Sequence, residues 1–303
     1  MYHPSQVACN HSRCGLRVEF EGAWSHPRLE GSSSRALCVM CRGVVAREAI
    51  TQKTAARAPL IAVPERCLLT AAAAAEHLGP LLAHAASQSG QQQQQRRRPW
   101  WDLARQQQQR QHQQPLPPEL LLALLLASER QRGADSFWWP YIAALPPSPP
   151  CGWAMPAKQL AAELAGLEPM AAGWAERVQV AAAAVERQAQ AVAAAYGEQL
   201  GGLVADDISW ALGHVLSRCF GSGEDLALLP LIDCCNHRQH ADQPDSFTSA
   251  ASEPCAAITC RHDGAAQALP AGGELFISYV AGTSPLSMFL NFGFVPPEHR
   301  GQA

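Results

Sequence analysis

The hydrophobic and polar positions of the chain predict a long helical middle. Residues 119–132 (ELLLALLLASERQR) are apolar on nearly every side and predict a buried helix, whose acidic start and basic end suit the helix dipole. Residues 157–199 are rich in alanine and predict two or three helices, broken near Pro169. The aromatic cluster between these stretches, residues 137–141, is interpreted as packing rather than as a binding site.

A further helix is predicted to begin at a cap formed by Asp206 or Asp207. Its apolar residues recur at the spacing of one helical face: Ile208, Ala211, Leu212, Val215, Leu216 and Cys219. Ser217 and Arg218 lie off this face, close to the end of the helix. His214 is expected to be a partly exposed residue of the same helix.

Short runs with strand character stand on both sides of the helical middle. Before it, a turn at Gly43 opens one run and Pro64 stops another. After it, strands are predicted at residues 228–232, 256–260 and 274–280, with a polar loop at 241–254. In the last strand, Leu275, Ile277 and Tyr279 share one face. This order predicts an α+β fold with a β-rich core that a helical insertion interrupts.

A low-complexity segment separates two of the predicted helices. Thr70 is a plausible N-cap for an alanine-rich helix at residues 71–82. Residues 88–118 then consist largely of glutamine, arginine and proline, which bury too little apolar surface to offset the entropy of ordering. We interpret this segment as a solvated insertion, and its cluster Arg96 to Arg98 as a charged loop face rather than an RNA contact.

Composition and charge narrow the possible partners. The 303 residues are 48% hydrophobic and 16% charged, which suits one large or two small globular domains. The net charge of −3 gives no global basic field for nucleic acid or for an anionic membrane. The longest apolar run, residues 120–127, is far shorter than the roughly 18–20 residues of a membrane span. No nucleic-acid or membrane partner is therefore expected.

The N-terminus and the cysteines predict an intracellular protein, in the cytoplasm, the nucleus or a plastid. The first residues lack the charged and apolar regions of a secretory signal. Acidic residues at Glu19, Glu21 and Glu30 argue against a transit peptide. The eleven cysteines are scattered, which fits reduced thiols better than a disulfide framework.

The candidate chemistry gathers in residues 228–240 (LLPLIDCCNHRQH), where an apolar run ends in Asp233. Asn236 and His237 could form part of a pocket for a small cofactor. Alternatively, the neighbouring cysteine and histidine residues could bind a metal: Cys234, Cys235, His237 and His240. Adjacent cysteines do not easily chelate one ion, and the spacing is not that of zinc ligand pairs. The pocket is therefore the favoured interpretation.

A second zinc site is conceivable at Cys38-x-x-Cys41, completed by Cys9, His11 and Cys14. The Cys38 pair leads into an apolar strand, and the spacing of the other three residues is irregular. A zinc-binding protein therefore stays a minor alternative, and no metal is expected.

Several segments, taken together and in order, resemble the SET-domain protein methyltransferases. They are ALCVMCRGVVAREAI, PLIAVPERCLLT, SFWWPYIAALP, WALGHVLSRCF, LLPLIDCCNH, and GGELFISYV followed by NFGF. The most similar branch has a helical insertion inside the SET core, as in the Rubisco large-subunit lysine methyltransferases and their relatives. The segments cover most of residues 37–295.

The resemblance implies a β core with knot-like threading of its C-terminal part, a topology that the sequence pattern alone would not suggest. Residues 1–36 would be a poorly ordered extension, and residues 37–78 and 206–303 the two parts of the core. Residues 79–205 would be the helical insertion. The chain stops at Ala303, before the helical domain that binds substrate in many relatives. A monomer is expected.

The resemblance also implies S-adenosylmethionine as methyl donor and a protein side-chain nitrogen as acceptor, with lysine preferred over histidine. The residues that match cofactor-binding positions are Arg42, Gly43, Val44, Arg218, Asp233, Asn236 and His237. Arg218 would meet the cofactor carboxylate, a contact that a guanidinium makes well. Tyr279 matches the catalytic tyrosine, and Ser217 and Phe292 match positions facing the substrate.

Methyl transfer of this kind needs alignment and dryness more than reactive side chains. The acceptor amine must be neutral, which a nearby sulfonium and desolvation favour. Three positions depart from the family pattern: Met40 replaces a glutamate, Val280 a glycine and Phe292 a tyrosine. These departures and the early C-terminus motivate a second hypothesis, a non-catalytic SET-like scaffold.

Overall fold

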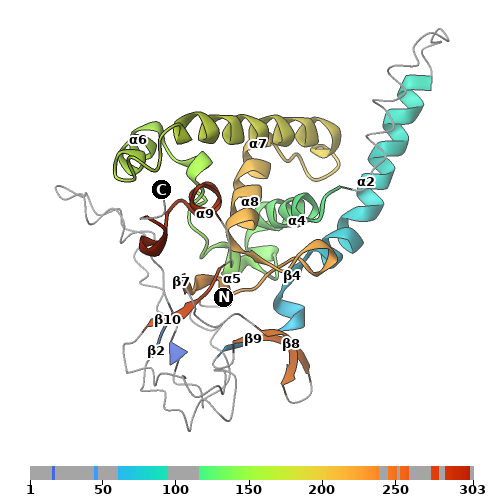
Figure 1. The fold of residues 1–303 in the computed structure, drawn as a ribbon. Coiled ribbons are helices and arrows are strands. Elements are labelled where there is room, and N and C mark those ends of the chain that lie inside the picture. The colour runs from blue at the N-terminus through green and yellow to red at the C-terminus, as the bar shows by residue number, and fades with distance from the viewer. Residues whose placement is uncertain are drawn as a thin grey trace.

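The computed structural model describes residues 16–17, 44–46, 61–94, 116–238, 245–250, 253–258, 274–279 and 284–300. The predicted positions Met40, Arg42, Gly43 and Val280 lie outside these residues, as do the candidate zinc ligands before residue 44. Within the described part, helices and strands form a mixed fold, with helices above and most strands below in Figure 1. No helix in that part is long and apolar enough to cross a membrane.

The helical part occupies most of the chain between residues 71 and 218. Its helices are α2 (Ala71–Gln94), α4 (Pro118–Arg132), α5 (Trp139–Ile142), α6 (Ala157–Ala165), α7 (Trp174–Tyr196) and α8 (Ala205–Arg218). Helix α9 (Pro285–Phe292) comes later in the chain and lies beside α8 and α7 (Figure 1). The helices expected at residues 119–132 and 157–199 are thus confirmed, the latter as two helices separated at residues 166–173.

The strands are short and form three sheets within the described residues. They are β1 (Leu16–Arg17), β2 (Val44–Ala46), β3 (Ile61–Pro64), β4 (Leu69–Thr70), β5 (Cys219–Phe220), β6 (Ala227–Leu228), β7 (Asn236–His237), β8 (Asp245–Ala250), β9 (Glu253–Ile258) and β10 (Glu274–Ile277). The sheet orders are β1-β2-β10-β7, β3-β9-β8 and β4-β6-β5. Strand β4 comes before these helices in the chain, and its partner β6 comes after them. The helical segment is therefore inserted between two neighbouring strands of one sheet.

The sheet containing β10 joins distant parts of the chain. Strand β10 runs parallel to β7, with Phe276 opposite Asn236 and Ile277 opposite His237. On its other side β10 runs antiparallel to β2, with Leu275 opposite Val44. Three of the predicted cofactor-binding residues, Val44, Asn236 and His237, therefore lie on one sheet, and Tyr279 comes two residues after the end of β10.

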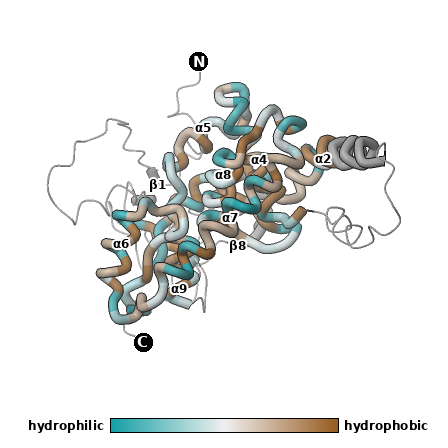
Figure 2. Tube along the Cα trace, turned by 90° about the horizontal axis from the view of Figure 1, so that it is seen from above, coloured by the Kyte–Doolittle hydropathy of each residue, from teal (hydrophilic) through white to brown (hydrophobic). Residues whose placement is uncertain are grey.

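The helices pack around the apolar helix α4. Its residues Leu122, Leu124, Leu125 and Leu126 are fully buried and belong to one cluster with Ile208, Ala211, Leu212 and Val215 of α8. Hydrophobic stretches lie where α4 approaches α2 and α8 (Figure 2). The apolar face predicted for α8 is therefore confirmed, and burial of this face fixes the direction in which the end of α8 points.

Helices α2 and α8 differ in detail from expectation, α2 at its end and α8 at its start. The cap of α2 is as predicted, because the Thr70 hydroxyl accepts the N–H of Ala73 at 3.0 Å. Helix α2 continues to Gln94, so the first part of the expected solvated insertion is helical instead. At α8 the N-cap residue is Val204 rather than an aspartate. Asp207, the third residue of the helix, accepts the backbone N–H of Val204 with its carboxylate at 3.3 Å.

The strand predicted at residues 228–232 is wrong beyond Leu228. The backbone of Leu231 has a φ of 72°, a left-handed conformation that no regular strand accommodates. A 3₁₀ turn, η6 (Ile232–Cys234), follows it and carries Asp233. Strand β8 also occupies part of the expected loop at 241–254. Hydrophobicity alone did not distinguish a buried turn from a buried strand.

Substituting Gly213 by alanine is expected to destabilise the protein by about 1–3 kcal/mol through overpacking. A Cβ at this position of α8 would lie 2.5 Å from Cγ of Pro149, a rigid side chain. That clash outweighs the gain in helix propensity, about 1 kcal/mol. Gly79→Ala in α2 is the matched control, because its Cβ would meet nothing within 4 Å. Urea unfolding should show the control unchanged or stabilised, and equal behaviour of the two variants would contradict the argument.

Candidate active site

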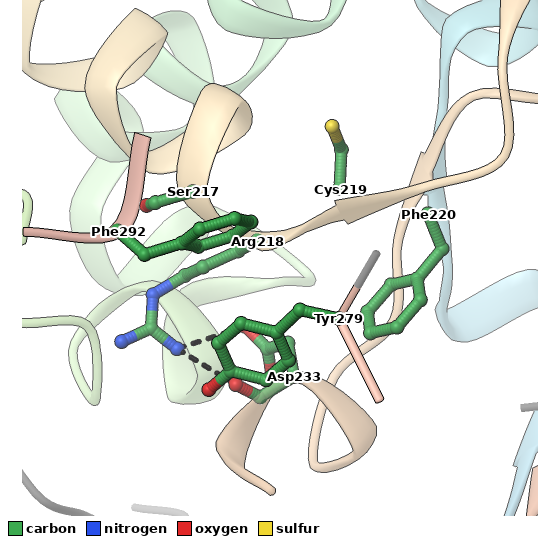
Figure 3. Close-up of a pocket in the computed structure, with 7 residues that line it drawn as sticks. All are labelled: Ser217, Arg218, Cys219, Phe220, Asp233, Tyr279 and Phe292. Atoms are coloured by element: carbon green, nitrogen blue, oxygen red, sulfur yellow. Dashed lines mark hydrogen bonds and ion pairs between the residues drawn. The ribbon is translucent and has the colours of Figure 1, made fainter. Parts of the chain in front are cut away.

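A small cavity opens where α8 ends, beside η6 and the end of β10. Its walls come from residues distant in the chain: Ser217, Arg218, Cys219, Phe220, Asp233, Tyr279 and Phe292 (Figure 3). The volume of about 40 Å³ suits a few waters or one small polar group. The structure thus brings together five of the predicted site residues at one place, from α8, η6, α9 and the segment that follows β10.

Arg218 and Asp233 form a buried ion pair in the wall of this cavity. Nη1 of Arg218 donates to the Asp233 backbone oxygen at 3.0 Å and to Oδ2 at 3.3 Å. The side chains are only 14% and 0% exposed, so water screens the pair little. Burial acts to lower the pKa of Arg218, but Asp233, together with the smaller effects of Tyr141, Cys234 and Tyr279, outweighs it, and the pKa of Arg218 is raised. Arg218 is therefore a permanent cation at the cavity.

Arg218 also carries a buried donor that lacks a partner. Its Nε is enclosed and makes no hydrogen bond with any described residue. A buried unsatisfied donor costs roughly 1–3 kcal/mol, so an acceptor placed beside it would be favoured. A carboxylate is the best complement to a guanidinium because it accepts charge-assisted hydrogen bonds. The site therefore fits the carboxylate of an amino-acid-like ligand.

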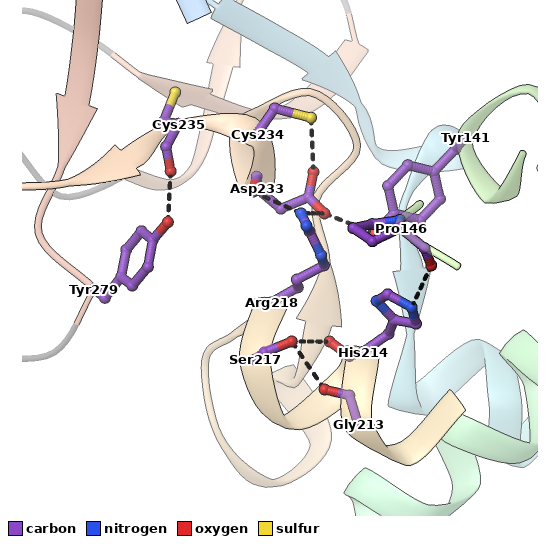
Figure 4. Close-up of polar contacts among 10 residues, drawn as sticks. All are labelled: Tyr141, Pro146, Gly213, His214, Ser217, Arg218, Asp233, Cys234, Cys235 and Tyr279. Atoms are coloured by element: carbon purple, nitrogen blue, oxygen red, sulfur yellow. Dashed lines mark hydrogen bonds and ion pairs between the residues drawn. The ribbon is translucent and has the colours of Figure 1, made fainter. Parts of the chain in front are cut away.

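The Asp233 carboxylate has further donors that the sequence did not predict. Tyr141, from α5 in the helical part, donates its hydroxyl to Oδ2 at 2.8 Å (Figure 4). The thiol of Cys234 lies 3.7 Å from Oδ1. Burial raises the pKa of the Asp233 carboxyl, and Arg218 and Tyr141 act in the opposite direction. Tyr141 therefore makes a polar contact with a residue of the site, in addition to the packing expected for residues 137–141.

Tyr279 lies among aromatic rings in the wall of the cavity. Its hydroxyl donates to the backbone oxygen of Cys235 at 3.0 Å, and burial raises the pKa of Tyr279. Its ring centroid is 4.9 Å from Phe292 and 5.2 Å from His237. Tyr279 is thus a neutral hydroxyl held in a fixed, largely apolar setting, which suits orientation of a polar group.

Asn236 and His237 are fixed from β10 rather than exposed in the cavity. The backbone N–H of Tyr279 donates to Nδ1 of His237 at 3.1 Å, so this nitrogen carries no proton. The Asn236 amide donates to Oε1 of Glu274 at 2.6 Å. These bonds add to the β7–β10 pairing and set the side chains beside Tyr279. Glu274 had no signal of its own in the sequence.

Ser217 lines the cavity but uses its hydroxyl locally. The hydroxyl donates within α8, to the Gly213 oxygen at 2.8 Å and toward that of His214 at 3.3 Å. Cys151 contacts the same Gly213 oxygen at 3.2 Å and the Asn291 oxygen at 3.3 Å. Cys151 therefore ties the end of α8 to α9, the helix that carries Phe292. The assigned contacts of Ser217 and Phe292 with substrate stay predictions.

His214 is fully buried, so its expected partial exposure is wrong. Its Nε2–H donates to the Pro146 oxygen at 3.0 Å, and its ring lies 4.6 Å from that of Trp210. Burial and the nearby Arg218 lower the pKa of His214 to about 3. The reason is that the loop at residues 146–150 packs against α8, where Pro149 lies beside Gly213 and Pro146 contacts His214.

His214 is expected to make stability depend on acid. In the unfolded chain a histidine binds a proton below about pH 6.5, whereas folded His214 stays neutral down to about pH 3. Stability from this residue is therefore present above pH 6.5 and lost as the pH falls, by at most about 1.4 kcal/mol per pH unit. Denaturation curves between pH 7 and 5 should show a shallower loss in His214→Gln. A wild-type slope in His214→Gln would refute the assignment.

The described residues contain no group of three or more histidine, cysteine or acidic side chains that could hold a metal. Cys234, Cys235 and His237 are described and do not form such a group, while His240 lies outside the described residues. Five described cysteines, Cys67, Cys151, Cys219, Cys234 and Cys235, are free thiols.

Neither the family models nor the curated proteins contain a match to this chain. Solved structures do match it. The SET domain of LSMT bound to lysine and AdoHcy superposes with a TM-score of 0.62 and 18% identity, over 95% of this chain and 54% of that one. Rubisco LSMT bound to AdoMet gives a TM-score of 0.56 and 19% identity, over 84% of this chain and 50% of that one.

The chain has the fold of the SET domain. Rubisco LSMT bound to sinefungin and monomethyllysine agrees, with a TM-score of 0.59, 18% identity and coverage of 95% of this chain and 54% of that one. The chain spans about half the length of these structures. The resemblance to SET-domain methyltransferases that the ordered segments predicted is thus confirmed at the level of the fold.

Proposed function

We propose that this SET-fold protein is an S-adenosylmethionine-dependent protein N-methyltransferase with lysine as its acceptor. The observation that carries the proposal is the meeting of Tyr279 with the Arg218–Asp233 pair in one cavity. The similar SET domain of LSMT was solved with lysine and AdoHcy, the demethylated form of such a cofactor. A site for an amino acid carboxylate beside a neutral tyrosine agrees with that pair of ligands.

The residues of this chain fit the amino-acid part of the cofactor. Arg218 would hold its carboxylate, because its charged guanidinium belongs to the wall of the cavity. Asn236 and His237 would border the cofactor from β7, and Val44 stands two strands away on the same sheet. When bound, the cofactor supplies an electrophilic methyl group on a sulfonium. The cavity alone is too small for the whole molecule, so the remainder would lie outside it.

Side chains of the cavity would position the acceptor nitrogen and keep water away from it. Tyr279 would orient the amine through its hydroxyl oxygen, whose proton is committed to the Cys235 carbonyl. An oxygen that already donates its proton has lone pairs left to accept from an amine. The rings of Phe220 and Phe292 line the cavity and exclude water. Desolvation of this kind favours the neutral amine that must attack.

Phe292 bears on the number of methyl groups transferred. It stands 4.9 Å from the Tyr279 ring, centroid to centroid, and brings no hydroxyl to the cavity. An amine in this cavity would therefore have one hydrogen-bond partner fewer than it would have with a tyrosine at position 292. It could turn more freely after a first methylation. We propose that the product includes more than one methyl group.

The alternative function is a non-catalytic SET-like scaffold, which the contacts of Phe292 and Tyr279 would also allow. Because Phe292 lacks a hydroxyl and Tyr279 donates its proton to the Cys235 carbonyl, neither aromatic residue offers a free hydroxyl proton to an acceptor in the cavity. Such a protein would bind the cofactor without turnover. Binding and transfer must therefore be measured separately.

The proposal is tested first with the unmodified chain. Calorimetry should show saturable binding of AdoMet and AdoHcy, and incubation of a lysate with methyl-labelled AdoMet should yield labelled methyllysine. Excess unlabelled AdoHcy, as product, should suppress the label and is the control. Binding without any label would favour the scaffold. If neither AdoMet nor AdoHcy binds at millimolar concentration, both the proposed activity and the proposed cofactor are contradicted.

A further inference from the structure

Helix α5 is anchored so that Tyr141 reaches the cavity wall from the helical part. The Ser136 hydroxyl donates to Oε2 of buried Glu129 at 2.6 Å, and accepts the N–H of Trp138 at 3.1 Å. The indole of Trp138 then donates to the Cys67 oxygen at 3.2 Å. These bonds hold the start of α5 between α4 and the strand region. Tyr141 therefore has a fixed backbone from which to contact Asp233.

The Asp233 carboxylate is held from three directions. Tyr141 of α5 and Arg218 of α8 share Oδ2, at 2.8 Å and 3.3 Å, and the thiol of Cys234 faces Oδ1 at 3.7 Å (Figure 4). Oδ2 is thus the atom through which α5 contacts the Arg218–Asp233 ion pair. Without the tyrosine donor, the carboxylate would be free to turn, and the guanidinium would lose the fixed anion that directs it.

We propose that Tyr141 is a positioning residue of the cofactor site: it fixes the Asp233 carboxylate and, through it, the guanidinium of Arg218. The inference rests on the proposed function, because Arg218 matters here as the receptor for the cofactor carboxylate. It also assigns the helical part a role, since α5 supplies the donor that completes the site. Tyr141 touches no cofactor or acceptor atom and acts only through Asp233.

The proposal predicts a specific loss. Tyr141→Phe removes one oxygen and keeps the ring, and AdoHcy affinity should fall about tenfold, as expected for a lost hydrogen bond to a charged group. Tyr196→Phe is the matched control, because Tyr196 at the end of α7 packs against the same helical core. Calorimetry measures both, after thermal melting has shown that each variant is folded. Tyr196→Phe should bind like the wild type.

A merely structural role is separated by a double-mutant cycle. If Tyr141 acts through Asp233, Tyr141→Phe should cost about tenfold in the wild-type background and less than about twofold in Asp233→Asn. The pH dependence of AdoHcy binding gives a second readout. The groups facing the carboxylate are Arg218, Tyr141 and Cys234, and loss of the tyrosine donor should shift the acidic loss of affinity to higher pH.

The outcomes distinguish this inference from the proposed function. A wild type that does not bind AdoHcy contradicts the proposed function. A wild type that binds, with Tyr141→Phe binding equally well, contradicts only the role of Tyr141. If Tyr141→Phe does not fold, ¹⁹F NMR of the wild type labelled with fluorotyrosine decides, since the chain has four tyrosines. AdoHcy should shift the Tyr141 resonance, assigned by elimination; an unmoved resonance overturns the role.

Discussion

Arg218→Met should lower the free energy of unfolding by about 3–5 kcal/mol and remove measurable AdoHcy binding. The guanidinium provides two hydrogen bonds to Asp233, at 3.0 Å and 3.3 Å, and the aspartate side chain is fully buried. Removing the cation leaves that carboxylate unpaired in a low-dielectric setting, which costs far more than the pair itself contributes. Chemical denaturation measures the stability, and calorimetry the binding.

The same substitution at Arg130 is the control. The Arg130 guanidinium lies 3.9 Å from Asp207, and the two side chains are 41% and 29% exposed, so this pair contributes little. Arg130→Met should therefore cost no more than about 1 kcal/mol. Adding Asp233→Asn to Arg218→Met should restore part of the stability without restoring binding. Equal destabilisation by the two arginine variants would show that Arg218 is not the critical partner of Asp233.

The helical part could be predicted closely because its apolar residues either form a long run, as in α4, or recur at helical spacing, as in α8. Helix α4 is apolar on nearly every side and is buried, and the packed face of α8 is formed by Ile208, Ala211, Leu212 and Val215. The strands could be predicted less well, because most have only two to four residues and carry no clear alternation. Leu231 shows the reason in one residue: its left-handed backbone ends an apolar run that otherwise resembles a buried strand.

The candidate site could be predicted mainly from residue order rather than from chemistry. Arg218, Asp233 and Tyr279 do meet in one cavity, although 15 residues separate the first pair. Tyr141 was missed because it stands 92 residues from Asp233 and its neighbours are aromatic, a pattern that equally describes packing. Only the fold brings such a hydroxyl to a carboxylate. The knot-like threading, the domain boundaries, the monomeric state and the intracellular location stay predictions.

Tyr279→Phe is expected to reduce methyl transfer by at least about 100-fold while AdoHcy affinity changes less than about threefold. The variant removes the hydroxyl that donates to the Cys235 carbonyl at 3.0 Å and keeps the ring contacts with Phe292 and His237. A neutral hydrogen bond of this kind stabilises a protein by about 1 kcal/mol, so the variant should fold. Transfer of label from AdoMet to lysine measures the rate.

Three tyrosine variants then separate three roles by one chemical change. Tyr279→Phe should lose turnover and keep binding, because its hydroxyl would orient the acceptor. Tyr141→Phe should weaken AdoHcy binding about tenfold, because its hydroxyl fixes Asp233. Tyr196→Phe, in the helical core, should change neither. Wild-type turnover in Tyr279→Phe would remove the hydroxyl from the mechanism and leave alignment by the aromatic walls of Phe220 and Phe292 as the source of the rate.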